Sequence, residues 1–511
     1  MNNDIGRFLA KRAHLDPHQE AVVELESGRR FTYAELDARA NRIADALLDK
    51  GVRKGDRVAL LMMNGVEYLE SYFGAAKIGA VLVPLNWRLA PPELEFILAD
   101  SGSETLLFDG EFDAVAGALR GLATPVQHWI RAGEGTLDFA DGYDTLCAGA
   151  ASTPPRAEAH GDDLLFIMYT SGTTGTPKGA VHTHETMTWA SLTINLTTDM
   201  RHGDRYLQVM PLFHVGALTP ATSMLHRGGT LVVMRTFDPT KIFEVIERER
   251  ISLGLVVPAM LQFMWAQPSR TTCDHSSLRW LMSGAAALPI SLLERYAGMG
   301  IGLYQVYGLT ETCGPACLIS PQLAAERPGS TGRAFFHTEV RVVGEEGQDV
   351  APGEVGEVWI RGAHVMKEYW NQPEATAEAV RDGWLLSGDL ARVDEDGFIY
   401  ICDRKKDMIL SGGENIYPAE VESVLTAHPG IIEAAVIGQA SKTWGESQLA
   451  IVVVAPGEEL SEGDVIEHCR SRLAGYKVPR RVVFTDALPR NATGKVLKKD
   501  LRRIHPGPAS E

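Results

Sequence analysis

The chain carries Thr170-Ser-Gly-Thr-Thr-Gly-Thr-Pro-Lys178-Gly179 directly after an apolar strand expected at residues 164–169. Glycines let backbone N–H groups turn toward an anion, and serine and threonine hydroxyls add further donors. Lys178 adds positive charge, but it follows proline and precedes glycine, so the stretch is not a Walker A loop. A plain surface turn is the alternative. Four threonines, one serine and three glycines in ten residues instead favour a loop that holds a polyphosphate.

Strands and helices alternate on the N-terminal side of this loop. Apolar residues of one helical face recur between residues 34 and 49, and Gly51 follows as a stop signal. The expected order is helix 34–49, strand 58–62, helix 68–78 and strand 80–85. Such βαβ punctuation predicts parallel sheet.

The pattern changes near the charged run Asp403-Arg-Lys-Lys-Asp407. About a hundred residues follow it, with their own alternation of helices and strands, which is enough for a small α+β domain. The sequence therefore predicts three parts, which are an N-terminal domain over 1–402, a hinge over 403–407 and a C-terminal domain over 408–511. A charged run of this kind also fits a simple linker.

Size and composition narrow the class of protein. A chain of 511 residues with 45% apolar and 23% charged residues is typical of a multidomain globular protein. Its 49 basic and 66 acidic residues leave a formal charge of −17, which argues against nucleic-acid binding. The sequence contains no run of 18 apolar residues, so it predicts no transmembrane segment. The first twelve residues have no long apolar stretch and predict no signal peptide. Six scattered cysteines suit a reduced, cytoplasmic protein.

Four further motifs follow the glycine-rich loop. In chain order they are Tyr307-Gly-Leu-Thr-Glu311-Thr312, Trp384-Leu-Leu-Ser-Gly-Asp389, Asp403-Arg404-Lys-Lys406-Asp407 and Pro489-Arg-Asn-Ala-Thr-Gly-Lys495. Together the five resemble, in order and spacing, the signatures of the adenylate-forming superfamily. That superfamily includes acyl- and aryl-CoA synthetases, nonribosomal adenylation domains and firefly-type luciferases. The overall likeness is to bacterial fatty-acyl-CoA synthetases.

The resemblance implies an α/β protein, with a large N-terminal domain of stacked mixed sheets and helices and a small, mobile α+β C-terminal domain. It also implies two half-reactions, in which a carboxylic acid and ATP give acyl-AMP and the acyl group then passes to CoA. Mg2+ is the implied metal, with Glu311 as its ligand. Glu311, Thr310, Lys178 and Lys495 are the implied catalytic residues. The implied ATP- and AMP-binding residues are Thr170, Ser171, Gly172, Thr173, Thr174, Gly175, Lys178, Ser283, Gly284, Ala285, Gln305, Tyr307, Gly308, Thr310, Asp389, Arg404 and Lys495.

These residue types suit the implied chemistry. Two anions must approach each other in the first half-reaction, so the site needs positive charge and hydrogen-bond donors aimed at the transition state. Glu311 offers oxygen to a hard cation, and Lys495 would bridge the carboxylate and phosphate oxygens. Asp389 would accept hydrogen bonds from the ribose, with Arg404 beside it, and Tyr307 would face the adenine. Taken singly, each of these residues fits an ordinary structural role equally well.

The implied acyl pocket contains His214, Gly308, Cys313 and Gly314. Acetate-specific relatives carry tryptophan at the position of Gly308, so glycine there leaves room for a longer acyl group. His214 would act as a gate, or it is a core histidine. Neither the residues beside His214 nor the stretch 313–318 contains an arginine, which argues against a dicarboxylate substrate.

The implied CoA and hinge residues are Lys406, Gly412, Gly413 and Trp444. Two glycines let a narrow pantetheine pass close to the backbone. Leu410 stands where aromatic-acid relatives often carry lysine, which argues against an aromatic acid. The small, apolar stretch 313–318 favours an apolar monocarboxylate, a medium- or long-chain fatty acid.

Three alternatives stay open, which are an aryl or alicyclic acid, an enzyme that loads a carrier protein, and a lipid-binding or regulatory protein descended from an enzyme. The oligomeric state is also open, with a homodimer among the options. So is peripheral membrane contact through Arg7, Lys11 and Arg12.

Overall fold

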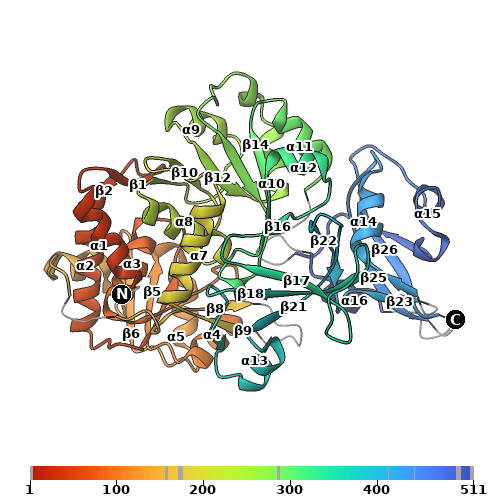
Figure 1. Cartoon of the computed structure of the whole chain (residues 1–511). Helices are drawn as coiled ribbons and strands as arrows, with labels where there is room; N and C mark the ends of the chain where they lie inside the picture. The colour runs from red at the N-terminus through yellow and green to blue at the C-terminus, as the bar shows by residue number, and fades with distance from the viewer. Residues whose placement is uncertain are drawn as a thin grey trace. The chain divides into compact units, whose positions relative to one another are not determined.

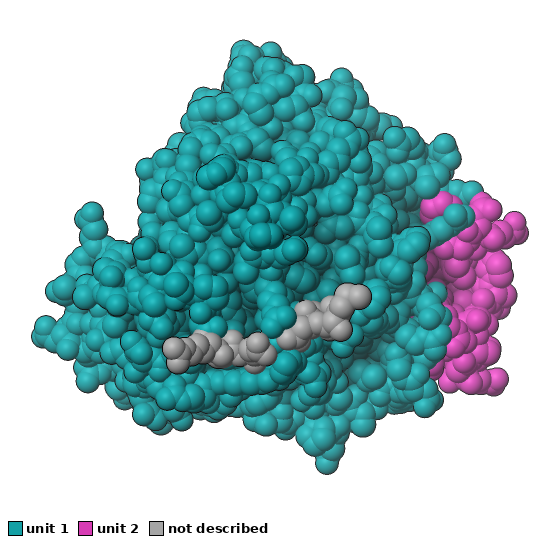
Figure 2. Space-filling view, turned by 60° about the vertical axis from the view of Figure 1, so that its left-hand side comes forward, with its two compact units in different colours: residues 1–340, 360–386 teal, residues 341–359, 387–511 magenta. Residues whose placement is uncertain are grey.

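The computed structural model describes residues 4–155, 159–170, 177–284, 288–411, 414–441, 444–490 and 496–506. The chain forms two compact units (Figure 2), one of residues 1–340 and 360–386 and the other of residues 341–359 and 387–511. Among the described residues, no helix combines the length and apolar character needed to cross a membrane.

A nine-stranded mixed sheet forms one half of the first unit (Figure 1). Its strands, in spatial order, are β16 (Arg333–Ala334), β15 (Cys317–Ile319), β14 (Gly302–Tyr307), β13 (Trp280–Ser283), β12 (Leu253–Val256), β10 (Arg205–Gln208), β11 (Thr230–Val233), β1 (Glu20–Glu24) and β2 (Arg30–Thr32). The central strands are parallel, and β2, β15 and β16 add antiparallel edges.

An eight-stranded sheet forms the other half of this unit. Its strands, in order, are β19 (Glu368–Tyr369), β9 (Lys178–Thr183), β8 (Leu164–Thr170), β4 (Val81–Pro84), β3 (Arg57–Leu61), β5 (Thr105–Asp109), β6 (His128–Ala132) and β7 (Asp141–Gly142). The parallel pairing of β3 with β4 and β5 confirms the βαβ prediction. Strands β8 and β9, which flank the expected loop in the sequence, pair antiparallel.

Helices cover both faces of each sheet. The helices of the first unit are α1 (Ile5–Leu15), α2 (Tyr33–Asp49), α3 (Val66–Ile78), α4 (Pro91–Ser101), α5 (Asp113–Arg120), α6 (Tyr143–Gly149), α7 (His184–Thr197), α8 (Val215–Arg227), α9 (Ile242–Arg248), α10 (Pro258–Trp265), α11 (Ile290–Ala297), α12 (Pro321–Glu326) and α13 (Pro373–Ala379). One apolar core joins α1, α2, α3, α7 and α8 to strands of both sheets. Helices α9 to α11 cover the far face of the first sheet, and α4 and α5 that of the second.

Helix α2 shows how the local sequence sets these elements. Thr32 caps its N-terminus by accepting from the backbone N–H of Glu35, whose side chain accepts from the backbone of Thr32 in return. The apolar face predicted from the spacing, including Leu36, Ile43 and Leu47, is fully buried. The predicted helix therefore forms, and it begins one residue earlier than expected.

Two further sheets contain the remaining strands. One has the order β17 (Glu339–Val343), β18 (Val355–Arg361), β21 (Trp384–Val393) and β20 (Val380–Arg381), with β22 (Ile399–Arg404) beside β21. The other has the order β24 (Glu414–Ile416), β23 (Ile409–Ser411), β26 (Gly445–Val454) and β25 (Ile431–Ser441), with β27 (Arg481–Phe484) beside β26. Helices α14 (Pro418–Thr426), α15 (Glu462–Arg470) and α16 (Lys498–Ile504) pack on the latter sheet. The stacked α/β architecture and the α+β character of the C-terminal residues agree with the predicted fold class.

The compact units divide the chain at residues that differ from the predicted domain boundary. The division falls after residues 340, 359 and 386, within strands β17, β18 and β21. The segment 341–359 and the residues from 387 to 402 thus group with the C-terminal unit. Sequence patterning could not reveal this, because the hydrogen bonds between neighbouring strands join segments that are distant in the chain.

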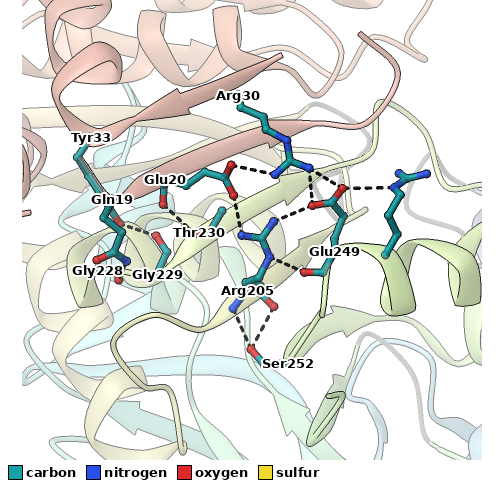
Figure 3. A network of polar contacts seen from close by, with 11 residues as sticks. Gln19, Glu20, Arg30, Tyr33, Arg205, Gly228, Gly229, Thr230, Glu249 and Ser252 are labelled. Carbon is teal, nitrogen blue, oxygen red and sulfur yellow. Dashed lines mark hydrogen bonds and ion pairs between the residues drawn. The ribbon is translucent and has the colours of Figure 1, made fainter. Parts of the chain in front are cut away.

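A network of two glutamates and two arginines joins strands β1, β2 and β10 of the first sheet (Figure 3). Arg30 donates to Glu20 and Glu249 over 2.9 and 2.7 Å, and Arg205 donates to the same two carboxylates over 2.6 and 2.8 Å. The side chain of Glu249 is only 5% exposed. Two guanidinium groups therefore share two carboxylates, and this network fixes β2 and β10 to the end of α9.

Replacement of Glu249 by alanine should destabilise the first unit, because it leaves Arg30 and Arg205 facing each other with one shared partner. We expect a loss of about 2 kcal/mol, which is less than for a fully buried pair because half of Arg30 is exposed. The urea midpoint of unfolding measures this loss. Glu247→Ala, an exposed glutamate in α9, is the matched control and should change stability by less than about 0.5 kcal/mol. Equal midpoints for the two variants would contradict the role of the network.

Candidate active site

The adjacent carboxyl ends of β13 and β14 bring predicted nucleotide-binding residues together. Ser283 ends β13, Tyr307 ends β14, and Ser283 pairs in register with Gln305. In open parallel sheets, ligands bind in the crevice outside these strand ends. The Ser283 hydroxyl is buried and has no hydrogen-bond partner within the described ranges. Gln305 is also buried, and its amide donates to the Ser330 carbonyl over 2.9 Å. Gln305 therefore holds a loop, whatever further role it has.

Gly308 is the point at which the chain folds back after β14. A Cβ atom there would lie only 1.5 Å from the carbonyl oxygen of Gly314, so no side chain fits without movement of the backbone. Cys313 and Gly314 both have positive φ, of 53° and 116°, and complete this tight loop. The sequence analysis explained glycine at position 308 by the room that it leaves for a longer acyl group. The geometry supplies a different reason, the close approach of two backbone segments, and the role in the acyl pocket stays a prediction.

Gly308→Ala should therefore distort the loop that leads to Glu311. We expect a loss of about 1–3 kcal/mol in stability and a fall of at least about tenfold in acyl-AMP formation. Melting temperature and pyrophosphate release measure the two effects. Gly117→Ala is the control, because the space around Gly117 in α5 is open and alanine is the better helix former. A fully active, equally stable Gly308→Ala variant would show that the backbone contact is unimportant.

Glu311 lies in a single 3₁₀ turn, η3 (Thr310–Thr312), which follows β14 and Gly308. Its carboxylate Oε1 accepts a 2.8 Å hydrogen bond from the hydroxyl of Tyr369, which lies on β19. Strand β19 pairs with β9, the strand that begins at Lys178. The Lys178 ammonium group lies 5.0 Å from the centre of the Tyr369 ring. Tyr369 thus contacts both the lysine of the phosphate loop and the implied magnesium ligand.

The donor set at Glu311 fits magnesium. Mg2+ prefers oxygen ligands and commonly takes only one or two protein carboxylates, with water and substrate phosphates completing its shell. Glu311 supplies a half-buried carboxylate whose orientation is fixed by Tyr369. Thr170, at the end of β8, lies at the other end of the glycine-rich loop, and its hydroxyl donates to the Lys178 carbonyl over 3.4 Å. The predicted loop residues 171–175 and Ala285 lie outside the described residues.

Asp389 and Arg404 meet in the C-terminal unit. They are register partners on the antiparallel strands β21 and β22, and Arg404 Nε lies 2.5 Å from Asp389 Oδ1. Asp389 is buried, and its backbone N–H donates to the Ser387 hydroxyl. The structure therefore brings together two residues that the sequence associated with the ribose. Their contact with a nucleotide stays a prediction.

The charged run at residues 403–407 is not a plain solvated linker. Asp403 and Arg404 belong to β22, and the Asp403 carboxylate accepts from the Ala419 backbone over 2.8 Å. Asp407 is buried and pairs with Arg502 at 2.9 Å. Lys406 is exposed at the surface, and partial desolvation lowers its pKa below the usual value. The hinge assignment stays a prediction, and the residues that would turn are held by specific contacts.

His214 lies at the start of α8, with its ring 4.2 Å from the ring of Phe213. Its Nε2 atom is buried without a hydrogen-bond partner in the part of the chain that the structure describes. Burial, with a smaller effect from Arg88, lowers the pKa of His214 to about 3, so the ring is neutral at physiological pH. An unpaired polar atom in such a place is compatible with a gate, and the role stays a prediction.

Arg88 is an arginine near the predicted acyl pocket that the sequence analysis did not single out. No arginine stands near His214 in the chain, but the loop after β4 brings the Arg88 guanidinium to 4.1 Å from the Trp87 ring and 6.0 Å from the Phe213 ring. Trp87 also packs edge-on against Phe213 at 5.9 Å. The sequence argument against a second substrate carboxylate considered only chain neighbours of His214 and the stretch 313–318, and it stays a prediction.

The predicted CoA residues lie in the second unit. Trp444 is 42% exposed, and the Arg480 guanidinium lies 4.5 Å from its ring centre. Leu410 is exposed on the neighbouring strand, and its backbone donates to Glu446 over 2.9 Å. Gly412 and Gly413 are outside the described residues, as is Lys495. The Trp444 assignment therefore stays a prediction, with Arg480 as a neighbour that the sequence did not single out.

Comparisons with known proteins agree with the motifs. Residues 9–370 match the family model described as AMP-binding enzyme, and residues 420–495 match the AMP-binding enzyme C-terminal domain. The long-chain-fatty-acid–CoA ligase FadD13 of Mycobacterium tuberculosis is 47% identical over 502 residues, which cover 98% of each chain. A feruloyl-CoA synthase of an Amycolatopsis species is 43% identical, over 98% of this chain and 99% of the other.

One similar solved structure contains ATP and a magnesium ion. The o-succinylbenzoate CoA synthetase of Bacillus subtilis, in complex with ATP and a magnesium ion, is 35% identical with a TM-score of 0.87. The match covers 97% of this chain and 99% of that one. Because a family model matches most of the chain and the relatives match it from end to end, the chain belongs to the AMP-binding enzyme family.

Proposed function

We propose that this protein is an acyl-CoA synthetase that converts a carboxylic acid, ATP and CoA into acyl-CoA, AMP and pyrophosphate. The contact of Tyr369 with both Glu311 and Lys178 carries the proposal, because it gathers a metal carboxylate and a phosphate-binding cation at one place. Bound Mg2+ would neutralise phosphate charge during the first step. The CoA ligases of the same family support the second step.

The protein's own residues would act in sequence. In the first step, a carboxylate oxygen of the acid bonds to the α-phosphorus of ATP, and the bond to the β-phosphate breaks to release pyrophosphate. Lys178 and the adjoining loop would hold the β- and γ-phosphates, and Lys495 would stabilise the charge that shifts between carboxylate and phosphate. In the second step, the CoA sulfur bonds to the acyl carbon, AMP leaves, and the thiol proton passes to solvent.

An apolar monocarboxylic acid of medium or long chain is the substrate class that we propose. Trp87, Phe213 and the predicted gate His214 form an aromatic cluster, which suits contact with an apolar acyl group. The 47% identity to a long-chain-fatty-acid–CoA ligase supports the same class. An aryl acid is the second candidate, supported by the feruloyl-CoA synthase at 43% identity.

A panel of acids tests this assignment. Purified protein with ATP, Mg2+ and CoA would be given acetate, fatty acids of increasing length, ferulate, indoleacetate and malonate, with AMP and acyl-CoA measured for each. We expect the highest kcat/KM with a fatty acid. A preference for ferulate would replace fatty acids by the second candidate. Formation of acyl-AMP and pyrophosphate without acyl-CoA would instead favour a carrier protein as acceptor. No pyrophosphate exchange with any acid would favour a non-enzymatic lipid-binding protein.

We also propose that the reaction takes place in the cytoplasm. All six cysteines are free thiols, which is usual in that reducing compartment. Fractionation of cells that produce the protein, followed by assay of ligase activity, tests this location.

A further inference from the structure

Two fully buried histidines contact the turn that carries Glu311. His182 Nε2 lies 2.7 Å from the carbonyl oxygen of Thr310, and His364 Nδ1 lies 2.9 Å from that of Thr312. Both side chains have no exposed surface. A carbonyl oxygen can only accept, so each of these ring nitrogens carries the proton and donates it to the turn. The two rings therefore adopt opposite tautomers and bind carbonyls on either side of Glu311.

The second nitrogen of His364 is also held, and that of His182 lies near a hydroxyl that donates to the Thr183 carbonyl over 2.9 Å. His364 Nε2 lies 2.8 Å from the hydroxyl of Thr338, which donates to it because His364 Nδ1 already carries the ring proton. His182 Nδ1 lies 3.3 Å from the hydroxyl of Thr186. Burial lowers the pKa of both histidines to about 4, so both rings are neutral at physiological pH. The His364 ring is thus held at both nitrogens, the His182 ring is held at Nε2, and neither ring adds charge beside Glu311.

Every carbonyl of the turn accepts a hydrogen bond from another segment. The Glu311 carbonyl accepts from the Met366 backbone over 2.7 Å, between the two histidine contacts. A single 3₁₀ turn has little stability of its own, because it fixes several dihedral angles for one internal hydrogen bond. The position of η3 therefore depends on β9, which supplies His182, and on the segment 362–369, which supplies His364 and Met366.

Two local features fit this arrangement. A Cβ atom on Gly362 would lie 2.7 Å from His364 Nε2, so glycine at that position leaves the space that the ring occupies. Lys178 and His182 are four residues apart on β9, and side chains of a strand alternate between its faces, so both belong to the same face. One strand thus presents the phosphate-loop lysine and the histidine that holds the metal-binding turn.

We propose that His182 and His364 are positioning residues that fix the Glu311 carboxylate and the Thr310 hydroxyl relative to Lys178 for binding of the magnesium–ATP complex. The inference rests on the proposed function, in which Glu311 binds magnesium. Neither histidine touches the substrates. Their effect is to hold the turn to within the small displacement that phosphoryl chemistry tolerates, since an error of about 1 Å costs up to about 100-fold in rate.

Paired substitutions separate the hydrogen bond from the bulk of the ring. His182→Leu and His364→Leu remove the donor. His182→Gln keeps an N–H near the position of Nε2, and His364→Asn keeps one near the position of Nδ1. We expect the leucine variants to need about tenfold more Mg2+ for half-maximal pyrophosphate exchange and to lose about tenfold in kcat. The amide variants should stay within about threefold of the wild type, and the KM for the acid should not change.

A binding measurement tests the positioning role without an activity assay. Titration calorimetry of magnesium–ATP, with no acid present, should show about tenfold weaker binding to the leucine variants than to the wild type. His184→Leu is the control for loss of a buried histidine, because His184 is equally buried but accepts from the Ile5 backbone, away from the turn. That variant should lose stability and keep its affinity for magnesium–ATP.

Thr338→Val tests the positioning role of His364 if the leucine variants do not fold. It keeps the shape of the side chain, loses only the hydroxyl that orients His364, and should weaken magnesium–ATP binding by about threefold. Unchanged magnesium dependence and affinity in the folded variants would overturn the inference. A wild type that makes no AMP with any acid but binds magnesium–ATP normally would overturn the proposed function and leave the positioning role intact.

Discussion

Lys495→Ala is expected to slow formation of acyl-AMP by about 100- to 1,000-fold while leaving transfer from pre-made acyl-AMP to CoA within about threefold of the wild type. The resemblance assigns Lys495 to the first half-reaction only, and the loss of one donor that stabilises transition-state charge has effects of this size. Pyrophosphate release measures the first step. Acyl-CoA formation from synthetic acyl-AMP measures the second.

The matched control is Lys499→Ala, an exposed lysine four residues later, in α16. It should behave as the wild type in both half-reactions. If Lys495→Ala impaired both steps equally, Lys495 would have a structural role. Near-normal pyrophosphate release would remove it from the catalytic residues altogether.

Glu311→Gln is expected to lower acyl-AMP formation by about 100-fold at moderate Mg2+ and to recover part of the loss at high Mg2+. Glutamine has nearly the same shape, and its carbonyl oxygen can still accept from Tyr369, so the turn should stay in place. The loss then isolates the negative charge that a hard cation requires. A titration of pyrophosphate exchange against Mg2+ gives both the rate and the half-saturation.

Glu326→Gln, at an exposed position in α12, is the control for the loss of one negative charge. It should leave the magnesium dependence unchanged. Tyr369→Phe adds a second comparison, because it keeps the charge of Glu311 and removes the hydroxyl that orients it. A Glu311→Gln variant with the wild-type response to Mg2+ would exclude Glu311 as the metal ligand.

Local patterns predicted most elements of the fold correctly. Helix α2 has both a capping box and a regular apolar face, and β8 is a short apolar run before a turn, so each is encoded within about 20 residues. The division into units was not predictable in the same way. It depends on which strands pair in space, as when β18 lies beside β21 in one sheet.

The residues of the candidate site also differ in how far the sequence predicted them. Glu311 and Lys178 could be recognised because each belongs to a contiguous motif. Tyr369, His182 and His364 carry no such motif, and each would be taken singly as a core residue. The sequence analysis singled out Gly308 because glycine leaves room for an acyl group, whereas the backbone geometry shows a close approach of Gly314. This approach depends on how the loop closes, which the local sequence does not reveal.

The sequence alone determined the family, the adenylate-forming chemistry and the residues of its motifs, because those signals are short and local. The tertiary structure decided which distant residues surround Glu311. His182 lies 128 residues from Thr310 in the chain and donates directly to its carbonyl, and Tyr369 reaches Glu311 across 58 residues. Contacts of this kind arise from sheet pairing and side-chain packing, whose geometry no local periodicity encodes.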